Sequence, residues 1–163
     1  MTEDQGPGGR TLIVGAGSSV RTDDGAGLLV VRRLRREGLP HGVEAEELRG
    51  GWTDLLERLG SYERIVIVDA MDAGEVPGTV LEIAPAGAGS GDRMRLAGSH
   101  LLGLAETLAL AEALGLPRSA ELRVIGIQVE DAMSISDTCT PAVEAAIALA
   151  CARVRRIVAS PPR

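Results

Sequence analysis

Two kinds of hydrophobic pattern alternate along this chain of 163 residues. A continuous apolar run, typical of a strand buried on both faces of a sheet, occurs at residues 64–69. A shorter apolar run at 11–14 predicts the first strand, and 121–129 predicts a second central strand. Segments with apolar residues at helical spacing lie between them. The clearest is 23–37, a helix that Thr22 or Asp23 could cap. This alternation predicts an α/β sandwich, with helices on both faces of a mainly parallel sheet.

The remaining segments complete this architecture. A weakly alternating run at 42–48 predicts a strand near a sheet edge, and 79–83 predicts a strand antiparallel to its neighbour, because it follows a Pro-Gly turn so closely. Three further helices are predicted, at 52–59, 99–115 and 141–158. Residues 84–98 are rich in glycine and lack periodicity, which predicts a flexible loop that acts as a lid.

Length and composition narrow the class of protein. The length suits one domain over residues 1–163, with loose tails at 1–10 and 159–163. A net charge of −6 and only one Trp and one Tyr disfavour nucleic acid as a partner. No apolar run approaches the roughly 20 residues that cross a bilayer, so no membrane partner is expected. There is no signal-peptide pattern and no CxxC pair, which favours the cytoplasm.

The most informative stretch is the turn after the first strand, Gly15-Ala16-Gly17, which leads to Asp23-Asp24-Gly25-Ala26-Gly27. It begins like a dinucleotide-binding fingerprint, but Val20 stands where the third glycine belongs. Two carboxylates at a helix start would also repel a phosphate. The loop therefore favours a cation or a positively charged group. For Asp24 the structural alternative is a favourable interaction with the helix dipole.

Asp69 and His100 join Asp24 as candidate ligands. Asp69 ends a central strand, and His100 begins a predicted helix after the glycine-rich loop. Because working residues in such sheets lie beyond the carboxyl ends of the strands, all three are expected at one edge. Two carboxylates and one imidazole suit a borderline divalent ion such as Zn²⁺ or Ni²⁺ and leave coordination positions open. The structural alternatives are a loop brace for Asp69 and a helix-cap role for His100.

Other groups near these positions have competing interpretations. No nearby serine stands in a G-x-S-x-G elbow, which disfavours a serine triad with His100. Cys139 precedes a helix start, where a thiol pKa can fall, so it is a candidate nucleophile, although a loop cysteine without a catalytic role is favoured. Asp23 and Asp72 adjoin the candidate ligands, and the sequence leaves open whether they support a metal site or brace loops.

Four segments in the right order resemble the hydrogenase maturation endopeptidases, which trim the C-terminus of the nickel–iron hydrogenase large subunit. They are 15–27, Val68-Asp69-Ala70-Met71-Asp72 with 77–79, Gly98-Ser99-His100-Leu101-Leu102-Gly103-Leu104, and Ile125-Gly126-Ile127-Gln128 with Thr140-Pro141-Ala142-Val143. The resemblance covers about residues 11–158. Two positions depart from the family pattern: Ser18 stands where the family commonly has Asn, and Val129 stands where it often has Pro. These two residues bear on the shape of the substrate groove, so the resemblance does not identify the matching hydrogenase.

The resemblance implies a three-layer α/β/α sandwich (phosphorylase/hydrolase-like) with a five-stranded, mostly parallel sheet and one antiparallel strand. It places the family's metal-contacting acids on Asp24 and Asp69 and its histidine on His100. It implies a monomeric, aspartic-type, metal-dependent endopeptidase that acts on a nickel-loaded large-subunit precursor. Nickel is expected to belong to the substrate rather than to act as a resident cofactor, because thiolates hold it more strongly than this ligand set. Either a metal-bound water or a carboxylate base could start the hydrolysis.

Two other functions remain as alternatives. A non-cleaving metal-checkpoint or assembly factor would bind the same precursor without shortening it. A small-molecule metallohydrolase on the same scaffold would turn over short amides or esters, which a peptidase gated by its protein substrate should refuse.

Overall fold

The computed structural model describes residues 9–48, 51–83 and 99–162, with only the backbone described for residues 99–102. The predicted lid at 84–98 lies outside these residues. The strands are β1 (Thr11–Ala16), β2 (Val43–Leu48), β3 (Arg64–Met71), β4 (Val80–Ile83) and β5 (Glu121–Gln128). The helices are α1 (Ala26–Glu37), α2 (Ser99–Ala113) and α3 (Pro141–Ala159), with 3₁₀ helices η1 (Asp23–Gly25) and η2 (Trp52–Leu55).

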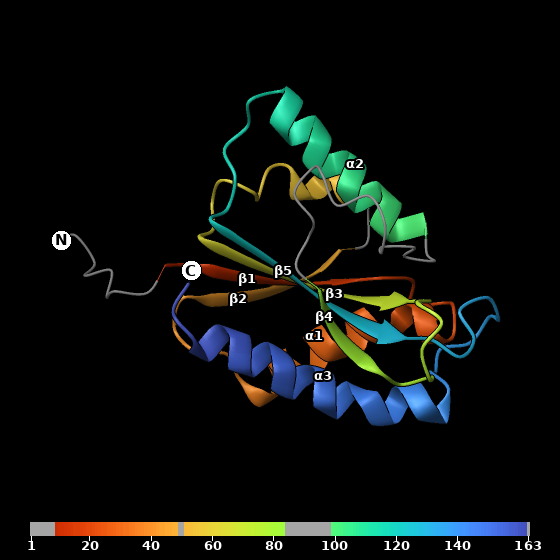
Figure 1. The fold of residues 1–163 in the computed structure, drawn as a ribbon. Helices are drawn as coiled ribbons and strands as arrows, with labels where there is room; N and C mark the ends of the chain where they lie inside the picture. Colours follow the sequence, from red (N-terminus) through yellow and green to blue (C-terminus); the bar gives the residue numbers. More distant parts are fainter. Residues whose placement is uncertain (1–8, 49–50, 84–98, 163) are drawn as a thin grey trace.

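The sheet has the strand order β2-β1-β3-β5-β4. The first four strands in this order are parallel, and β4 runs antiparallel to β5. Helices α1 and α3 lie on one face and α2 on the other, with η2 beside α2 (Figure 1). The predicted three-layer, mostly parallel sandwich is therefore confirmed. The antiparallel partner of β4 is β5, rather than β3, which precedes it in the chain.

Side chains of the central strand alternate between two apolar cores. Val66, Val68 and Ala70 contribute to the core under α1 and α3. Ile65 and Ile67 contribute to the core shared with η2 and α2. All eight residues of β3 are buried, which explains why its sequence is continuous rather than alternating. By the same alternation, residue 69 faces the α2 side of the sheet.

Several predicted boundaries are corrected. The helix predicted at 52–59 is the four-residue 3₁₀ helix η2 followed by turns, and the helix predicted from residue 23 begins as η1 and becomes α-helical at Ala26. Neither Thr22 nor Asp23 caps it with a side-chain hydrogen bond, because both side chains bond to a distant loop instead. Strand β3 also continues to Met71, so Asp69 lies within the strand rather than at its end.

The described ends of the chain are bonded to the body. The Arg10 guanidinium donates to Glu44 at 2.6 Å and lies 4.7 Å from the centre of the Tyr62 ring. The Ser160 carbonyl accepts a hydrogen bond from Arg64 at 2.9 Å. Within residues 9–48, 51–83 and 99–162, no helix combines the length and the apolar character needed to cross a membrane.

Candidate active site

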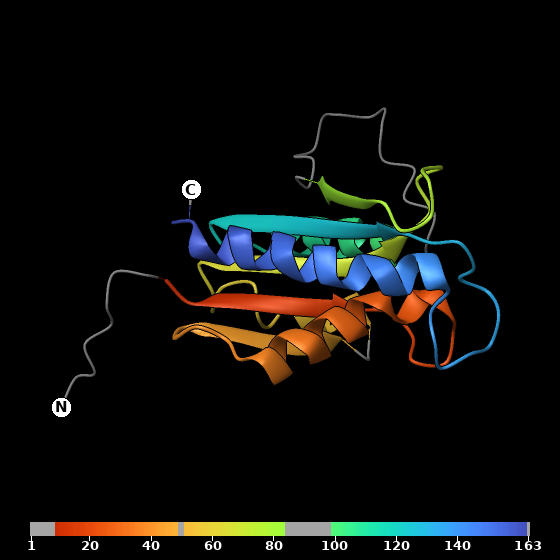
Figure 2. The ribbon, with the colours of Figure 1, turned by 90° about the horizontal axis from the view of Figure 1, so that it is seen from below.

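The carboxyl ends of β1, β3 and β5 point to the same edge of the sheet. Three segments extend from it, residues 17–25, 72–79 and 129–140, and they lie together at the right-hand end of the molecule in Figures 1 and 2. We call them the carboxyl-edge loops. They contain seven carboxylates and one arginine, so their net charge equals the −6 of the whole chain. This concentration of negative charge favours a cationic or basic ligand at this edge.

Glycines in the first carboxyl-edge loop allow close backbone contacts. Gly17 has a φ of +131°, and a Cβ there would collide with the Asp24 carbonyl. A Cβ on Gly27 would collide with the carbonyl oxygens of Ala16 and Val68. The start of α1 therefore presses directly on β1 and β3. This packing places η1, which carries Asp24, against the strand that carries Asp69.

The three predicted ligands come from three different elements, η1, β3 and α2. Asp24 lies in η1 and is partly exposed. Asp69 is fully buried in β3, and its Oδ1 accepts a hydrogen bond from the Ala70 N–H at 2.9 Å. His100 lies in the first turn of α2, the helix that covers the Asp69 face of the sheet (Figure 1). The side chain of His100 is not described, so a joint ligand set stays a prediction.

The described side chains include no group of three or more His, Cys, Asp or Glu residues that could hold a metal ion. The predicted set needs the imidazole of His100, which is not among the described side chains. The two aspartates supply hard oxygen donors, which hold a soft metal less tightly than thiolates do.

Asp23 is a structural anchor of this edge. Its fully buried carboxylate accepts hydrogen bonds from the N–H groups of Glu130 (2.8 Å), Asp131 (2.9 Å) and Thr140 (2.7 Å), and from the Thr140 hydroxyl (3.0 Å). The Asp23 N–H also donates to the Asp131 carbonyl at 3.0 Å. Asp23 therefore braces a loop, the second of the two roles that the sequence allowed. It fixes loop 129–140 beside Asp24.

Gln128 anchors a second carboxyl-edge loop, and sequence reasoning missed this role. Its buried amide donates to the Asp72 carboxylate at 3.1 Å and accepts from the N–H groups of Ala73 (2.7 Å) and Glu75 (3.2 Å). Asp72 is thus also a loop brace. The available signal was a polar residue directly after the apolar run 124–127 in a central strand, where a buried amide must find partners.

The alternative nucleophile, Cys139, lies in an unfavourable environment. Its thiol donates to the Thr22 carbonyl, with 3.4 Å between sulfur and oxygen. Burial, followed by the negative charges of Asp23 and Glu144, raises the pKa of Cys139 to about 11. Because the thiolate is the reactive form, the structure disfavours Cys139 as a nucleophile near neutral pH.

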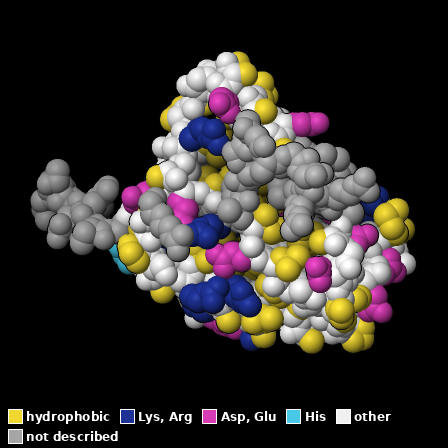
Figure 3. All heavy atoms as spheres, in the orientation of Figure 1, with side chains coloured by type: hydrophobic (Ala, Val, Ile, Leu, Met, Phe, Trp, Pro, Cys, Tyr) yellow, Lys and Arg dark blue, Asp and Glu magenta, His cyan; other side chains and the backbone are white. Residues whose placement is uncertain are grey.

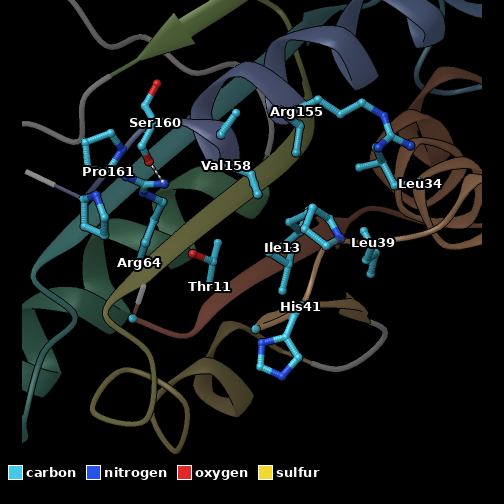
Figure 4. Close-up of a pocket in the computed structure, with 17 residues that line it drawn as sticks. Thr11, Ile13, Leu34, Leu39, His41, Arg64, Arg155, Val158, Ser160 and Pro161 are labelled. Carbon is cyan, nitrogen blue, oxygen red and sulfur yellow. Dashed lines mark hydrogen bonds between the residues drawn. The ribbon is translucent and has the colours of Figure 1, made fainter. Parts of the chain in front are cut away.

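A cavity of about 700 Å³ lies at the opposite edge of the sheet, between the start of β1 and the ends of α1 and α3 (Figure 4). Arg64 lines it and bonds to the Ser160 carbonyl, as the dashed line shows, and exposed His41 also lines it. Arg64 also donates to Glu121 at 2.8 Å, so its guanidinium is used to hold the fold. Neither Asp24 nor Asp69 lines this cavity, which separates it from the candidate active site.

Comparison with known proteins gives a consistent result. The HycI family, described as hydrogenase maturation protease, matches residues 30–157. The hydrogenase expression/formation protein HupD of Rhodobacter capsulatus is 30% identical over 154 residues, which span 90% of this chain and 70% of HupD. The hydrogenase maturating endopeptidase HybD of E. coli has a TM-score of 0.74 and 26% identity over 91% of each chain. The [NiFe] hydrogenase maturation protease HybD of Thermococcus kodakarensis shares the fold, with a TM-score of 0.71 and 24% identity over 91% of this chain and 99% of that one.

Proposed function

We propose that this chain, which belongs to the hydrogenase maturation protease family, removes the C-terminal extension of a nickel-loaded hydrogenase large-subunit precursor. Family membership makes it an endopeptidase of hydrogenase maturation. The proposal adds that cleavage depends on the metal, that the metal is the nickel of the substrate, and that three residues of this chain contact it.

The observation that carries the residue assignment is the fully buried carboxylate of Asp69 in the central strand. Burial of a carboxylate costs free energy unless specific interactions stabilise it, so a carboxylate between Val68 and Ala70 indicates a dedicated role. Asp24 lies in η1, which contacts the same strand, and His100 lies in the first turn of α2, the helix on the face of the sheet toward which residue 69 points. We assign all three side chains to the contact with the substrate's nickel.

The reaction is the hydrolysis of one peptide bond. A water molecule attacks the carbonyl carbon, the C–N bond breaks, and the proton lost by the water reaches the departing amine. Of the two aspartates, Asp24 is partly exposed and Asp69 is fully buried. We therefore assign contact with the attacking water to Asp24, as an aspartic-type base, and orientation of the substrate to Asp69. Polarisation of that water by the substrate's nickel is the competing route.

The negative charge of the carboxyl-edge loops supports recognition of a metal-loaded site. Seven carboxylates attract a cationic centre and raise its encounter rate, and the attraction falls as salt is added.

The proposal also includes that the protein is a monomer and that it is located in the cytoplasm. The free thiols of Cys139 and Cys151 suit a reducing compartment. Sedimentation of the purified protein and fractionation of the source cells would test these two points.

The decisive experiment is an intact-mass assay with nickel-loaded and nickel-free precursor. Wild-type protein should remove one C-terminal peptide from the loaded precursor only. Asp24→Ala, Asp69→Asn and His100→Ala should each lower the cleavage rate by about 100-fold or more, as expected for groups that contact the reacting atoms. Glu57→Gln removes an exposed carboxylate that lies outside the carboxyl-edge loops and is the control, with an unchanged rate expected.

Because Asp69 is buried, each variant must first show a wild-type circular dichroism spectrum and a cooperative melt. Equal cleavage of nickel-free precursor would overturn the metal requirement. Stable binding without any mass change would instead support the non-cleaving assembly factor.

A further inference from the structure

Large apolar side chains are concentrated at the proposed active edge. The described residues include seven exposed large hydrophobic side chains, and four of them lie on the carboxyl-edge loops. Their exposed fractions are 61% for Val20, 74% for Val76, 76% for Met133 and 89% for Ile135. Single exposed apolar residues are common, but several on neighbouring loops beside a reaction site indicate a binding surface.

These side chains are held on a fixed backbone. Arg21 and Ile135 form an antiparallel bridge, and the Ser136 N–H donates to the Val20 carbonyl at 3.2 Å. The carboxylate of Asp23 also anchors loop 129–140 through hydrogen bonds from its backbone N–H groups. A preorganised apolar surface loses little conformational entropy on binding, which favours tight contact with a partner.

We propose that Val20, Met133 and Ile135, with Val76 at the border, form the docking surface for the folded body of the precursor. This inference rests on the proposed function. A precursor whose C-terminal segment reaches Asp24 must approach over these loops, because Val20 precedes Asp24 by four residues and loop 129–140 is bonded to Asp23. The apolar surface is thus continuous with the edge where cleavage is proposed.

The charges around this surface define the chemistry of the partner. Exposed Glu75, Glu130 and Asp137 lie on the same loops. Figure 3 shows hydrophobic and acidic side chains side by side at the right-hand end of the molecule. The matching face on the precursor is therefore apolar with basic residues at its border. A second copy of this chain fits poorly, because two acidic borders would repel each other.

The test compares two double variants in the intact-mass assay over a range of loaded-precursor concentrations. Met133→Ser with Ile135→Ser removes the two most exposed apolar side chains of the surface. Leu114→Ser with Leu149→Ser removes two exposed leucines of the α2 end and α3, and is the matched control. We expect KM to rise about tenfold for the first variant, with kcat within about twofold, as for loss of central contact residues. The control should keep both wild-type values.

The outcomes separate this inference from the proposed function. An inactive wild-type protein would contradict the proposed function itself. An active wild type with unchanged KM in the Met133/Ile135 variant, or an equal KM increase in both variants, would overturn the docking surface alone. Sedimentation that shows a wild-type dimer and a monomeric Met133/Ile135 variant would also overturn it, in favour of self-association.

Discussion

The Asp23 carboxylate holds Thr140 by two hydrogen bonds, one from the backbone N–H at 2.7 Å and one from the hydroxyl at 3.0 Å. The two residues are 117 positions apart in the chain. Asp23 begins η1, and Thr140 directly precedes α3. This contact ties the first and last carboxyl-edge loops together beside Asp24, so the position of the proposed catalytic carboxylate depends on the C-terminal part of the chain.

Asp23→Asn should destabilise the fold and slow cleavage. In asparagine an NH2 group replaces one carboxylate oxygen. Its N–H donors would then face backbone N–H groups that now donate hydrogen bonds to that oxygen. Loss of these buried, charge-assisted hydrogen bonds is expected to lower the free energy of unfolding by about 2–4 kcal/mol. Urea denaturation followed by circular dichroism measures this change. The cleavage rate of the folded variant should fall about tenfold or more, since small displacements of reacting groups are costly.

Asp137→Asn, in the loop 129–140 that the Asp23 carboxylate anchors, is the stability control for Asp23→Asn. Its side chain is exposed, so the urea midpoint should stay at its wild-type value. Equal stability of the two variants would contradict an anchoring role for Asp23.

Gly27→Ala should disrupt the contact between α1 and the sheet. The added methyl group would overlap the carbonyl oxygens of Ala16 and Val68, which lie in β1 and β3. Overpacking of this kind is expected to cost about 1–3 kcal/mol or more in the free energy of unfolding. Thermal or urea unfolding tests this. Gly51→Ala is the control, since its nearest atom is the Thr53 hydroxyl at 3.4 Å, an ordinary contact.

Arg64→Met should be among the most destabilising single substitutions. Arg64 is buried, and its guanidinium donates to Glu121 (2.8 Å) and to the carbonyls of Ile157 (2.7 Å) and Ser160 (2.9 Å). Removal of one partner of a buried ion pair costs about 3–5 kcal/mol. Glu121 keeps its bond to Arg123, so the loss should lie at the lower end of that range.

Arg33→Met is the matched control for Arg64→Met, because it breaks the exposed pair between Arg33 and Glu37 in α1. The free energy of unfolding measured in urea should stay close to the wild-type value, as expected for a solvated ion pair. An equal decrease in the free energy of unfolding for the two arginine variants would contradict the larger contribution predicted for the buried pair of Arg64 and Glu121.

Cys139 should react slowly with iodoacetamide at pH 8. Burial, with the charges of Asp23 and Glu144 adding to it, raises its pKa to about 11, above the ordinary value of 9.0. The thiol therefore stays protonated in the folded protein until well above pH 9, and the reaction rate should rise about tenfold per pH unit up to about pH 11. Mass spectrometry of a Cys151→Ala background isolates this thiol.

Unfolding of the same variant in urea supplies the control, because an exposed thiol should reach its limiting rate near pH 9. Cys139→Ser should retain cleavage of the precursor. Rapid alkylation at pH 7, or loss of cleavage in the serine variant, would restore Cys139 as a candidate nucleophile.

The sequence by itself determined the strand and helix alternation, the buried central strand and the sheet-edge position of β2. These features follow from local hydrophobic periodicity, which is encoded within ten or fifteen residues. The sequence also predicted Asp24 as a candidate ligand beyond the glycine-rich turn that follows β1, because such a turn and paired carboxylates are local signals. The resemblance of four ordered segments supplied the family, and the comparisons confirm it.

The tertiary structure alone decided what the polar residues between these elements do. Local pattern suggested a capping role for Thr22 or Asp23, but their side chains bond to Ser134 and Thr140, more than 100 positions away. It likewise gave no sign that Gln128 holds Asp72, or that β4 pairs with β5. The reason is physical: a buried polar group takes whichever partner the fold brings within reach, and only the packed chain determines which partner that is.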